Sequence, residues 1–133
     1  MLEFLQQKIS RRKLIMNNFR NGFVAASVLE GGGHFSHSNC VMSEILGYTR
    51  GDLHGRTLEE IIYPDDLKEY HAQHSMLLQK RRCMLSMDEC RFFHKNGNLL
   101  SARLVILRIK HSSEKFIMVI NEAKEIQQSE NVE

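Results

Sequence analysis

The first 20 residues carry a helical pattern of apolar positions. Five apolar residues recur on a heptad frame: Leu2, Leu5, Ile9, Met16 and Phe19. Arg12 interrupts one inward position of this frame, and no Gly or Pro breaks the stretch, so the pattern predicts one amphipathic helix over residues 2–19. A helix of this length is marginally stable alone in water. Its apolar stripe therefore needs a covering surface, either in the same domain or on another chain.

Short segments punctuated by glycine follow this helix. The expected segments are two strands at residues 23–29 and 34–36, a helix through Leu46, and single helical turns at residues 49–53 and 57–62. Gly31-Gly32-Gly33 can form the tight connection between the two strands, because glycine adopts positive backbone dihedrals at little steric cost. Ser38 or Asn39 can cap the helix, and Gly47 stops it.

A longer helix is predicted from Asp65 to the basic run at residues 80–82. Acidic residues at its start and basic residues at its end agree with the direction of the helix macrodipole. Four residues repeat at intervals of four, three and four: Leu67, His71, His74 and Leu78. We therefore expect both histidines on the same side of the helix as the two leucines.

Three strands are predicted in the last third of the chain. They span residues 85–94, 99–110 and 115–121, and Asn96-Gly97 between the first two is a strong hairpin signal. The second and third strands are apolar on both faces. One face can pack on the helices, which leaves the other for the amino-terminal helix or a partner chain. The residues expected on that second face are Val105, Leu107, Ile117 and Val119.

Length and composition fit one folded domain. The chain has 133 residues, of which 42% are hydrophobic and 26% charged, a balance that can fill a single core. We divide it into a flanking helix over residues 1–20, a domain over residues 21–123 and a carboxyl-terminal tail over residues 124–133. The stretch EAKEIQQ at residues 122–128 can begin an output helix.

Charge, hydropathy and cysteine content restrict the partners and the compartment. The formal charge is only +2 and neither tail has a long basic run, so no nucleic-acid partner is expected for this segment. No apolar run approaches the length of about 20 residues that crosses a bilayer, so no membrane is expected. The cysteines Cys40, Cys83 and Cys90 are odd in number and form no closely spaced metal-ligand pair, which fits the cytoplasm or the nucleus.

Two sequence motifs resemble a known family signature. Residues 38–67, SNCVMSEILGYTRGDLHGRTLEEIIYPDDL, place an Asn near a helix start before a Leu-Gly-Tyr, a Leu-x-Gly and a Pro-Asp-Asp, and this order resembles the PAS signature. Residues 89–98, ECRFFHKNGN, resemble the later PAS element of Glu-x-Arg followed by a hairpin. The resemblance covers roughly residues 19–122.

The resemblance implies an α+β fold. In the PAS fold a five-stranded antiparallel sheet carries helices on one face, and here an amino-terminal amphipathic flanking helix would be added. The helices and the sheet can enclose a ligand pocket. The residues expected to line it are Leu46, Ile62, Leu78, Phe92 and Met118.

A cofactor is a further question that the resemblance raises. Some PAS domains hold haem through a histidine on their long helix, where this chain has His71 and His74. Alternatively, one histidine fills core space as a hydrogen-bonded ring and the other lies at the domain edge. No third and fourth ligand accompany the pair at informative spacing, so no metal site is expected.

Flavin chemistry of the light-sensing LOV type is not expected. Members of that branch attach flavin to a cysteine in the short central helix, and residues 55–66 of this chain, GRTLEEIIYPDD, contain no cysteine. Cys40 lies in an earlier helix, where a small half-buried residue is the simpler interpretation. Haem and noncovalently bound flavin remain open.

No catalytic arrangement accompanies these features. The serines lie in no Gly-x-Ser-x-Gly motif of the kind that carries a serine nucleophile. The acidic pairs at residues 59–60 and 65–66 fit helix starts and surface positions better than an acid/base pair. The resemblance implies a non-enzymatic sensory and dimerisation module of a larger signalling or transcription-regulating protein. It would relay the state of a ligand or partner through its flanking helices, as a homodimer or with another PAS-containing chain. The alternatives are a haem- or flavin-loaded sensor and an interaction domain whose pocket is filled by side chains.

Overall fold

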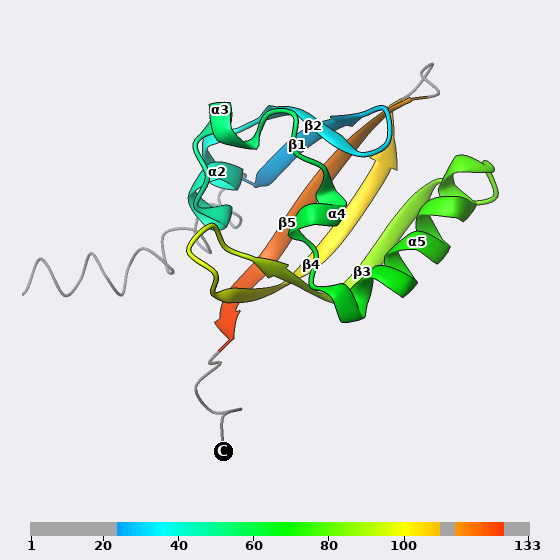
Figure 1. The fold of residues 1–133 in the computed structure, drawn as a ribbon. Helices are drawn as coiled ribbons and strands as arrows, with labels where there is room; N and C mark the ends of the chain where they lie inside the picture. The colour runs from blue at the N-terminus through cyan, green and yellow to red at the C-terminus, as the bar shows by residue number, and fades with distance from the viewer. Residues whose placement is uncertain (1–23, 110–113, 127–133) are drawn as a thin grey trace, which may run out of the picture.

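The computed structural model describes residues 24–109 and 114–126. Along the chain the elements are β1 (Ala25–Glu30), β2 (His34–Ser38), α2 (Cys40–Leu46), α3 (Arg50–Leu53), α4 (Leu58–Ile61), α5 (Pro64–Leu78), β3 (Met84–Phe93), β4 (Leu99–Arg108) and β5 (Lys115–Ile126) (Figure 1). The amino-terminal helix predicted over residues 2–19 lies outside the described residues. No helix in the described part of the chain is long and apolar enough to cross a membrane.

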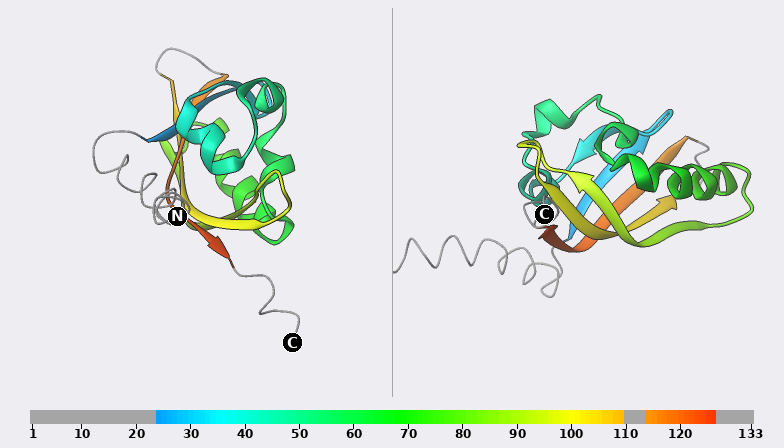
Figure 2. Two further views of the ribbon diagram at one scale, coloured as in Figure 1. Left: turned by 90° about the vertical axis from the view of Figure 1, so that its left-hand side faces the viewer. Right: turned by 60° about the horizontal axis from the view of Figure 1, so that its bottom comes forward.

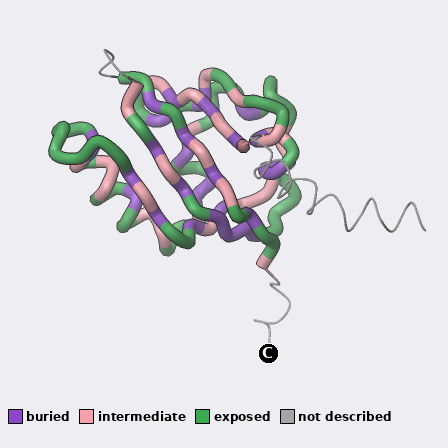
Figure 3. Tube along the Cα trace, turned by 180° about the vertical axis from the view of Figure 1, so that it is seen from behind, coloured by how far each residue is buried: buried purple, intermediate pink, exposed green. Residues whose placement is uncertain are grey.

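The strands form one five-stranded sheet in the order β2-β1-β5-β4-β3. Every neighbouring pair is antiparallel, which confirms the fold expected from the resemblance. The helices gather on one face of the sheet (Figure 2). From behind, the strands lie in open view, and buried and less buried residues alternate along them (Figure 3). We call the helix-covered face the inner face and the opposite face the outer face.

The core lies between the inner face and the helices. Alternate residues of each strand point into it, as Phe116, Met118 and Ile120 do in β5. The helices add large side chains that are 2% exposed or less, including Leu46 and Tyr70. Full burial of such a side chain contributes about 1.5–3 kcal/mol, so this layer is the main source of stability.

Asn39 joins β1 to α2. Its side-chain Oδ1 accepts hydrogen bonds from Met42 N (2.9 Å), which caps α2, and from Ala26 N (3.2 Å) in β1. Its Nδ2 donates to the carbonyl oxygen of Val24 (2.6 Å). Of the two caps expected at Ser38 and Asn39, Asn39 is the one observed, and it also binds the start of β1 to α2.

Gly47 ends α2 where the β3–β4 hairpin meets it. Its φ of 81° is in the left-handed region, and its N–H donates to the carbonyl oxygen of Ser43. The hairpin is bound to the same helix end, because Lys95 N donates to Leu46 O (2.9 Å). The His94 ring lies against Gly47, where it accepts a hydrogen bond from Asn96 N (3.1 Å) at Nδ1.

Helix α5 is bound to the free edge of β3 by two polar side chains. Asp66 accepts hydrogen bonds from Arg91 N (2.8 Å), Nε (3.1 Å) and Nη2 (2.8 Å). Gln73 donates to Ser86 O (3.0 Å) and accepts from Ser86 N (3.1 Å), so its amide replaces a neighbouring strand. These contacts satisfy backbone groups that an edge strand otherwise exposes.

The edge of β2 is covered in a similar way. The backbone N–H of Phe35 donates to Arg56 O (2.8 Å), and Gly55 N donates to Phe35 O (2.9 Å). The segment between α3 and α4 therefore pairs with part of the outer edge of β2. Both edge strands of the sheet have partners for some of their outward backbone groups.

The side of α5 predicted to face the core, that of His71, His74 and Leu78, is wrong by one residue. Leu78, expected in the pocket, is 53% exposed, whereas Leu77 and Tyr70 are buried. Asp66 and Gln73, seven residues apart, both bind β3 and therefore fix the rotation of the helix. That rotation turns the side of Tyr70 and Leu77 toward the core and Leu78 toward solvent.

The prediction of an output helix at residues 122–128 is wrong for residues 122–126, which belong to a strand. Strand β5 continues to Ile126, beyond the domain boundary expected at residue 123. Its last residues pair with β4, as Lys124 does with Ser101 and Ile126 with Leu99. The length of β4 explains this, because its first residues offer backbone groups that an extended partner satisfies. Residues 127–128 lie outside the described part.

The Gly47→Ala variant should be destabilised by about 2–4 kcal/mol. The left-handed conformation costs a non-glycine residue about 1–2 kcal/mol, and the added Cβ would also overlap three atoms of the His94 ring. Urea unfolding followed by circular dichroism measures the loss. Gly55→Ala is the matched control: its φ is 89°, but no atom lies within 4 Å of an added Cβ, so it should show the conformational cost alone. Equal losses in the two variants would contradict the role of the His94 ring.

The Asp66→Asn variant should be less stable than the wild type by about 1.5–3 kcal/mol at pH 7. Burial favours the neutral carboxyl group, but the hydrogen bonds from the Arg91 side chain and backbone outweigh it and hold the pKa of Asp66 below 3.8. A lowered pKa contributes stability above the unfolded-state pKa, and this contribution is lost as the pH falls through the folded-state pKa.

The difference between the wild type and Asp66→Asn should therefore shrink when urea unfolding is repeated near pH 3. Asp65→Asn, an exposed neighbour in the same first turn of α5, is the control and should change stability little at either pH. A difference that stays constant from neutral to acidic pH would refute the assigned ionic contact.

Candidate functional site

A row of exposed and partly exposed apolar side chains crosses the outer face. It consists of Val28 in β1, Ile117 in β5, Leu107 in β4 and Met84 in β3, which we call the apolar row. Each residue is the direct cross-strand partner of the next. Met84 is 46% exposed, Leu107 41% and Ile117 39%. Directly opposed side chains lie about 4.5–5.5 Å apart at Cβ, so the row is one continuous surface.

A second row lies beside the apolar row, and each of its members is two residues away from a member of the apolar row on the same strand. It consists of Ala26, Val119, Val105 and Ser86, each of which is the cross-strand partner of the next. All four are partly exposed. The structure therefore brings Val105, Leu107, Ile117 and Val119, the strand residues predicted for an interface, together on one surface. The other predicted interface residues, Leu2, Leu5, Ile9, Met16 and Phe19, lie outside the described part of the chain.

Two β-bulges flank β4 next to these rows. In β3, Asp88 and Glu89 lie opposite the single residue Arg103, and in β5, Glu122 and Ala123 lie opposite Ala102. An extra residue on one strand bends it and increases its twist. Glu122 has a φ of 56°, a conformation that few residues other than glycine adopt. The sequence carried no clear signal for either bulge.

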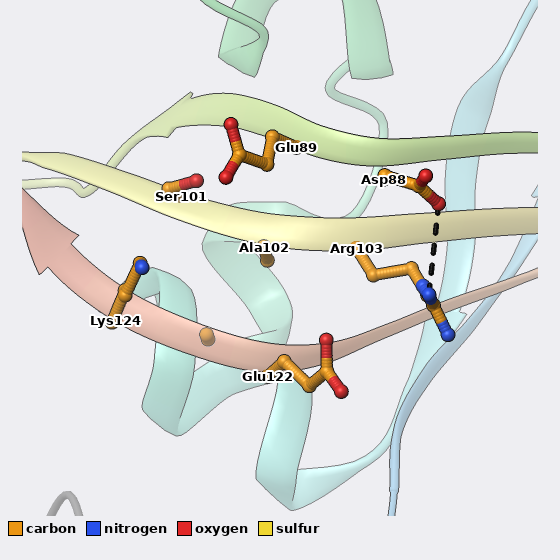
Figure 4. Close-up of a pocket in the computed structure, with 8 residues that line it drawn as sticks. Asp88, Glu89, Ser101, Ala102, Arg103, Glu122 and Lys124 are labelled. Carbon is orange, nitrogen blue, oxygen red and sulfur yellow. Dashed lines mark ion pairs between the residues drawn. The ribbon is translucent and has the colours of Figure 1, made fainter.

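The bulges open a pocket of about 580 Å³ on the outer face (Figure 4). It is lined by Asp88, Glu89, Ser101, Ala102, Arg103, Glu122, Ala123 and Lys124. Asp88 reaches across to Arg103, 3.6 Å from it, and Lys124 and Glu122 extend from β5. The outer face is thus divided into an apolar half and a half with charges of both signs.

The two histidines of α5 have different surroundings. His71 is exposed, and its Nε2 contacts the carboxylate of Glu59 in α4. His74 is half-buried between the rings of Tyr70 (5.4 Å between centroids) and Phe116 (5.9 Å, edge to face). Burial, and secondarily the charge of His71, lowers the pKa of His74. At neutral pH His74 is therefore a neutral ring in an aromatic stack.

These surroundings do not form a ready haem site. The ring nitrogen of His71 is engaged by a carboxylate, and His74 would have to leave its aromatic neighbours to ligate iron. Within the described residues, no group of three or more His, Cys, Asp or Glu side chains is placed to hold a metal ion.

Four of the five predicted pocket residues lie together in the core. They are Leu46, Ile62, Phe92 and Met118, each 2% exposed or less, and Leu78 is the exception noted above. Cys90 belongs to the same cluster, and burial raises its pKa to about 12, so its thiol stays protonated. Cys40 and Cys83 are exposed. Tyr70 was not expected at this site from the sequence, yet its buried ring contacts both histidines.

Known proteins resemble this chain in sequence and in fold. A family model described as the PAS fold matches residues 35–121. The probable diguanylate cyclase DgcE of Escherichia coli (strain K12) is 26% identical over 103 residues, which make up 75% of this chain but only 9% of that protein. The chain therefore spans less than a tenth of this curated relative.

Solved structures share the fold at low identity. The PAS domain of the fruit-fly ELK potassium channel is 18% identical with a TM-score of 0.62, over 86% of this chain and 95% of that one. A domain of a sensory box sensor histidine kinase/response regulator from Geobacter sulfurreducens is 17% identical with a TM-score of 0.64, over 80% and 92%. The relatives are thus parts of signalling proteins of different kinds. Because the family model covers most of the folded region, this chain belongs to the PAS family of sensory domains.

Proposed function

We propose that this PAS domain regulates a larger signalling or transcription-regulating protein by forming a dimer through the outer face of its sheet. The observation that carries this proposal is the apolar row. Monomeric proteins rarely expose a contiguous apolar surface of this kind, and such surfaces mark sites of association. The partner is a second copy of this chain or another PAS-containing chain, because a two-fold contact pairs the same patch on both subunits and an apolar patch can pack against its own copy.

The strands themselves provide the link between the core and the outer face. In β5, Phe116, Met118 and Ile120 point inward while Ile117 and Val119 point outward, so a change in core packing shifts the interface residues on the same strand. A ligand or partner with different affinity for two arrangements of these strands would shift the population between them. The amino-terminal segment would cover part of the outer face with Leu2, Leu5 and Ile9 and transmit the change.

The share of the curated relative that this chain covers supports a modular role. A segment that corresponds to 9% of a probable diguanylate cyclase leaves the catalytic output to other parts of such a protein. We therefore assign no catalytic activity to this domain. Action in the cytoplasm or nucleus, without nucleic-acid or membrane contact through this segment, remains part of the proposal.

Leu107→Glu should weaken the dimer at least tenfold, a loss of about 1.4 kcal/mol, because it places a charge in the middle of the apolar row. Sedimentation equilibrium of the full chain across the micromolar range measures the dissociation constant. Leu78→Glu is the matched control, since Leu78 is equally apolar and 53% exposed but lies on α5, away from the row. The double variant Leu5→Glu with Ile9→Glu tests the amino-terminal contribution. A wild type that is monomeric throughout this range, or equal weakening by Leu78→Glu, would overturn the proposal.

Freshly purified protein should show no stoichiometric haem or flavin absorption. For haem, the reason is that His71 contacts the Glu59 carboxylate and His74 packs against the Tyr70 ring. For flavin, the reason is that Leu46, Ile62, Phe92 and Met118 belong to one buried hydrophobic cluster. An absorption spectrum of the wild type makes the measurement, with His74→Ala and His71→Ala as comparisons. A haem Soret band that disappears in only one of the two variants would instead identify the iron ligand and establish the cofactor-bearing alternative.

A further inference from the structure

A second pocket lies between the edge strand β2 and helix α3, next to the Val28 end of the apolar row, because His37 is the cross-strand partner of Val28. Its volume is about 380 Å³, and it is lined by Ser36, His37, Ser38, Arg50, Gly51 and His54. The lining combines one permanent cation, two imidazoles and two hydroxyl groups, and it contains no carboxylate. No step of the proposed dimer mechanism uses these residues.

Hydrogen bonds determine which nitrogen of each imidazole carries the proton. His54 Nδ1 lies 3.0 Å from the carbonyl oxygen of Ser36, which can only accept, so Nδ1 is the protonated nitrogen. Ser36 Oγ donates its proton to Val28 O (3.1 Å) and therefore accepts from His37 Nδ1 at 3.4 Å, a weaker contact. In the neutral rings, Nε2 of both histidines is therefore the unprotonated nitrogen, and each becomes a donor when it gains a proton.

The charges around the pocket favour an anion over a metal cation. Arg50 forms no ion pair within the described part of the chain. Asp52, in the same helix, is bound to Lys95 at 3.0 Å. A metal ion would meet the Arg50 guanidinium with no carboxylate in the lining to offset it. An anion would meet a guanidinium group, which suits the geometry of phosphate oxygens.

Other charged groups on the surrounding elements are engaged or distant. Arg56, after α3, pairs with Glu60 at 3.6 Å, and Glu30 in β1 is the strand partner of His34, at the opposite end of β2 from His37 and Ser38. Glu44 of α2 does not line the pocket. The titratable side chains of the lining are therefore His37 and His54.

We propose that this pocket binds a phosphoryl dianion, with Arg50 as the permanent cation and with His37 and His54 as donors in their imidazolium forms. The hydroxyl groups of Ser36 and Ser38 line the same space. Each Nε2 atom must carry a proton to donate a hydrogen bond to the anion. The site borders the outer-face interface at His37, the strand partner of Val28, but the proposed phosphate contacts do not require a dimer.

Calorimetric titration of the full chain with inorganic phosphate tests the site, with chloride at matched ionic strength as the reference. Saturable binding is expected at neutral pH. Arg50→Ala should raise the dissociation constant about tenfold or more, because a charge-assisted contact is lost. Arg82→Ala, which removes an exposed arginine that does not line the pocket, should leave it unchanged. Circular dichroism confirms that both variants are folded.

Two results would overturn the proposal: no saturable phosphate binding, or equal weakening by Arg82→Ala. Titration with Zn²⁺ adds a direct comparison, and tighter binding of the metal than of phosphate would also refute an anion site. The source of the phosphoryl group is tested by a phosphoserine peptide. Binding at least tenfold tighter than phosphate would support the site with a phosphorylated protein as its source, and equal affinity would support it with a free phosphate compound.

Discussion

The sheet has apolar side chains on both faces of its central strands, but helices cover only one of them. On the inner face, residues such as Leu104 and Met118 are fully buried beneath the helices. On the outer face, their neighbours Leu107 and Ile117 remain in contact with solvent. Because the side-chain period of a strand is two, neither set can be buried further by shifting the register without exposing the other. The arrangement of the core and the exposure of the outer face are therefore consequences of one alternation.

Polar contacts place the long helix relative to this sheet. Asp66 and Gln73 bind backbone groups of β3, and their positions determine that Tyr70 and Leu77 face inward. Hydrophobic burial supplies most of the free energy, but it does not distinguish well between neighbouring leucines on a helix. Two directional hydrogen-bonding side chains do distinguish between them, because they fix the rotation of the helix. The half-buried position of His74 beside Phe116 follows from the same rotation.

Much of the fold could be predicted from the sequence because its signals are local. Asn39 and Gly47 marked the ends of α2, and Asn96-Gly97 marked the β3–β4 hairpin, since caps and turns depend on a few adjacent residues. The alternation in β4 and β5 placed Val105, Leu107, Ile117 and Val119 on one face.

The remaining features depend on contacts between distant segments. The choice between Leu77 and Leu78 depends on β3, and the extension of β5 to Ile126 depends on β4. The bulges at Glu89 and Glu122 shift the pairing by one residue and leave no pattern in a single strand. In the same way, the pocket at β2 unites residues from two elements that are separated in sequence, so its histidines and Arg50 had no recognisable spacing.

Contacts within the chain cover part of both edges of the sheet. Gln73 binds the backbone of Ser86 in β3, and the segment after α3 pairs with Phe35 in β2. Both margins of the sheet already use backbone donors and acceptors within the chain, which hinders another strand from aligning there and extending the ladder. Growth of the sheet into an open-ended fibre is disfavoured at both sides. In the dimer proposed above, association through the outer face with two-fold symmetry would instead be complete once two chains have met.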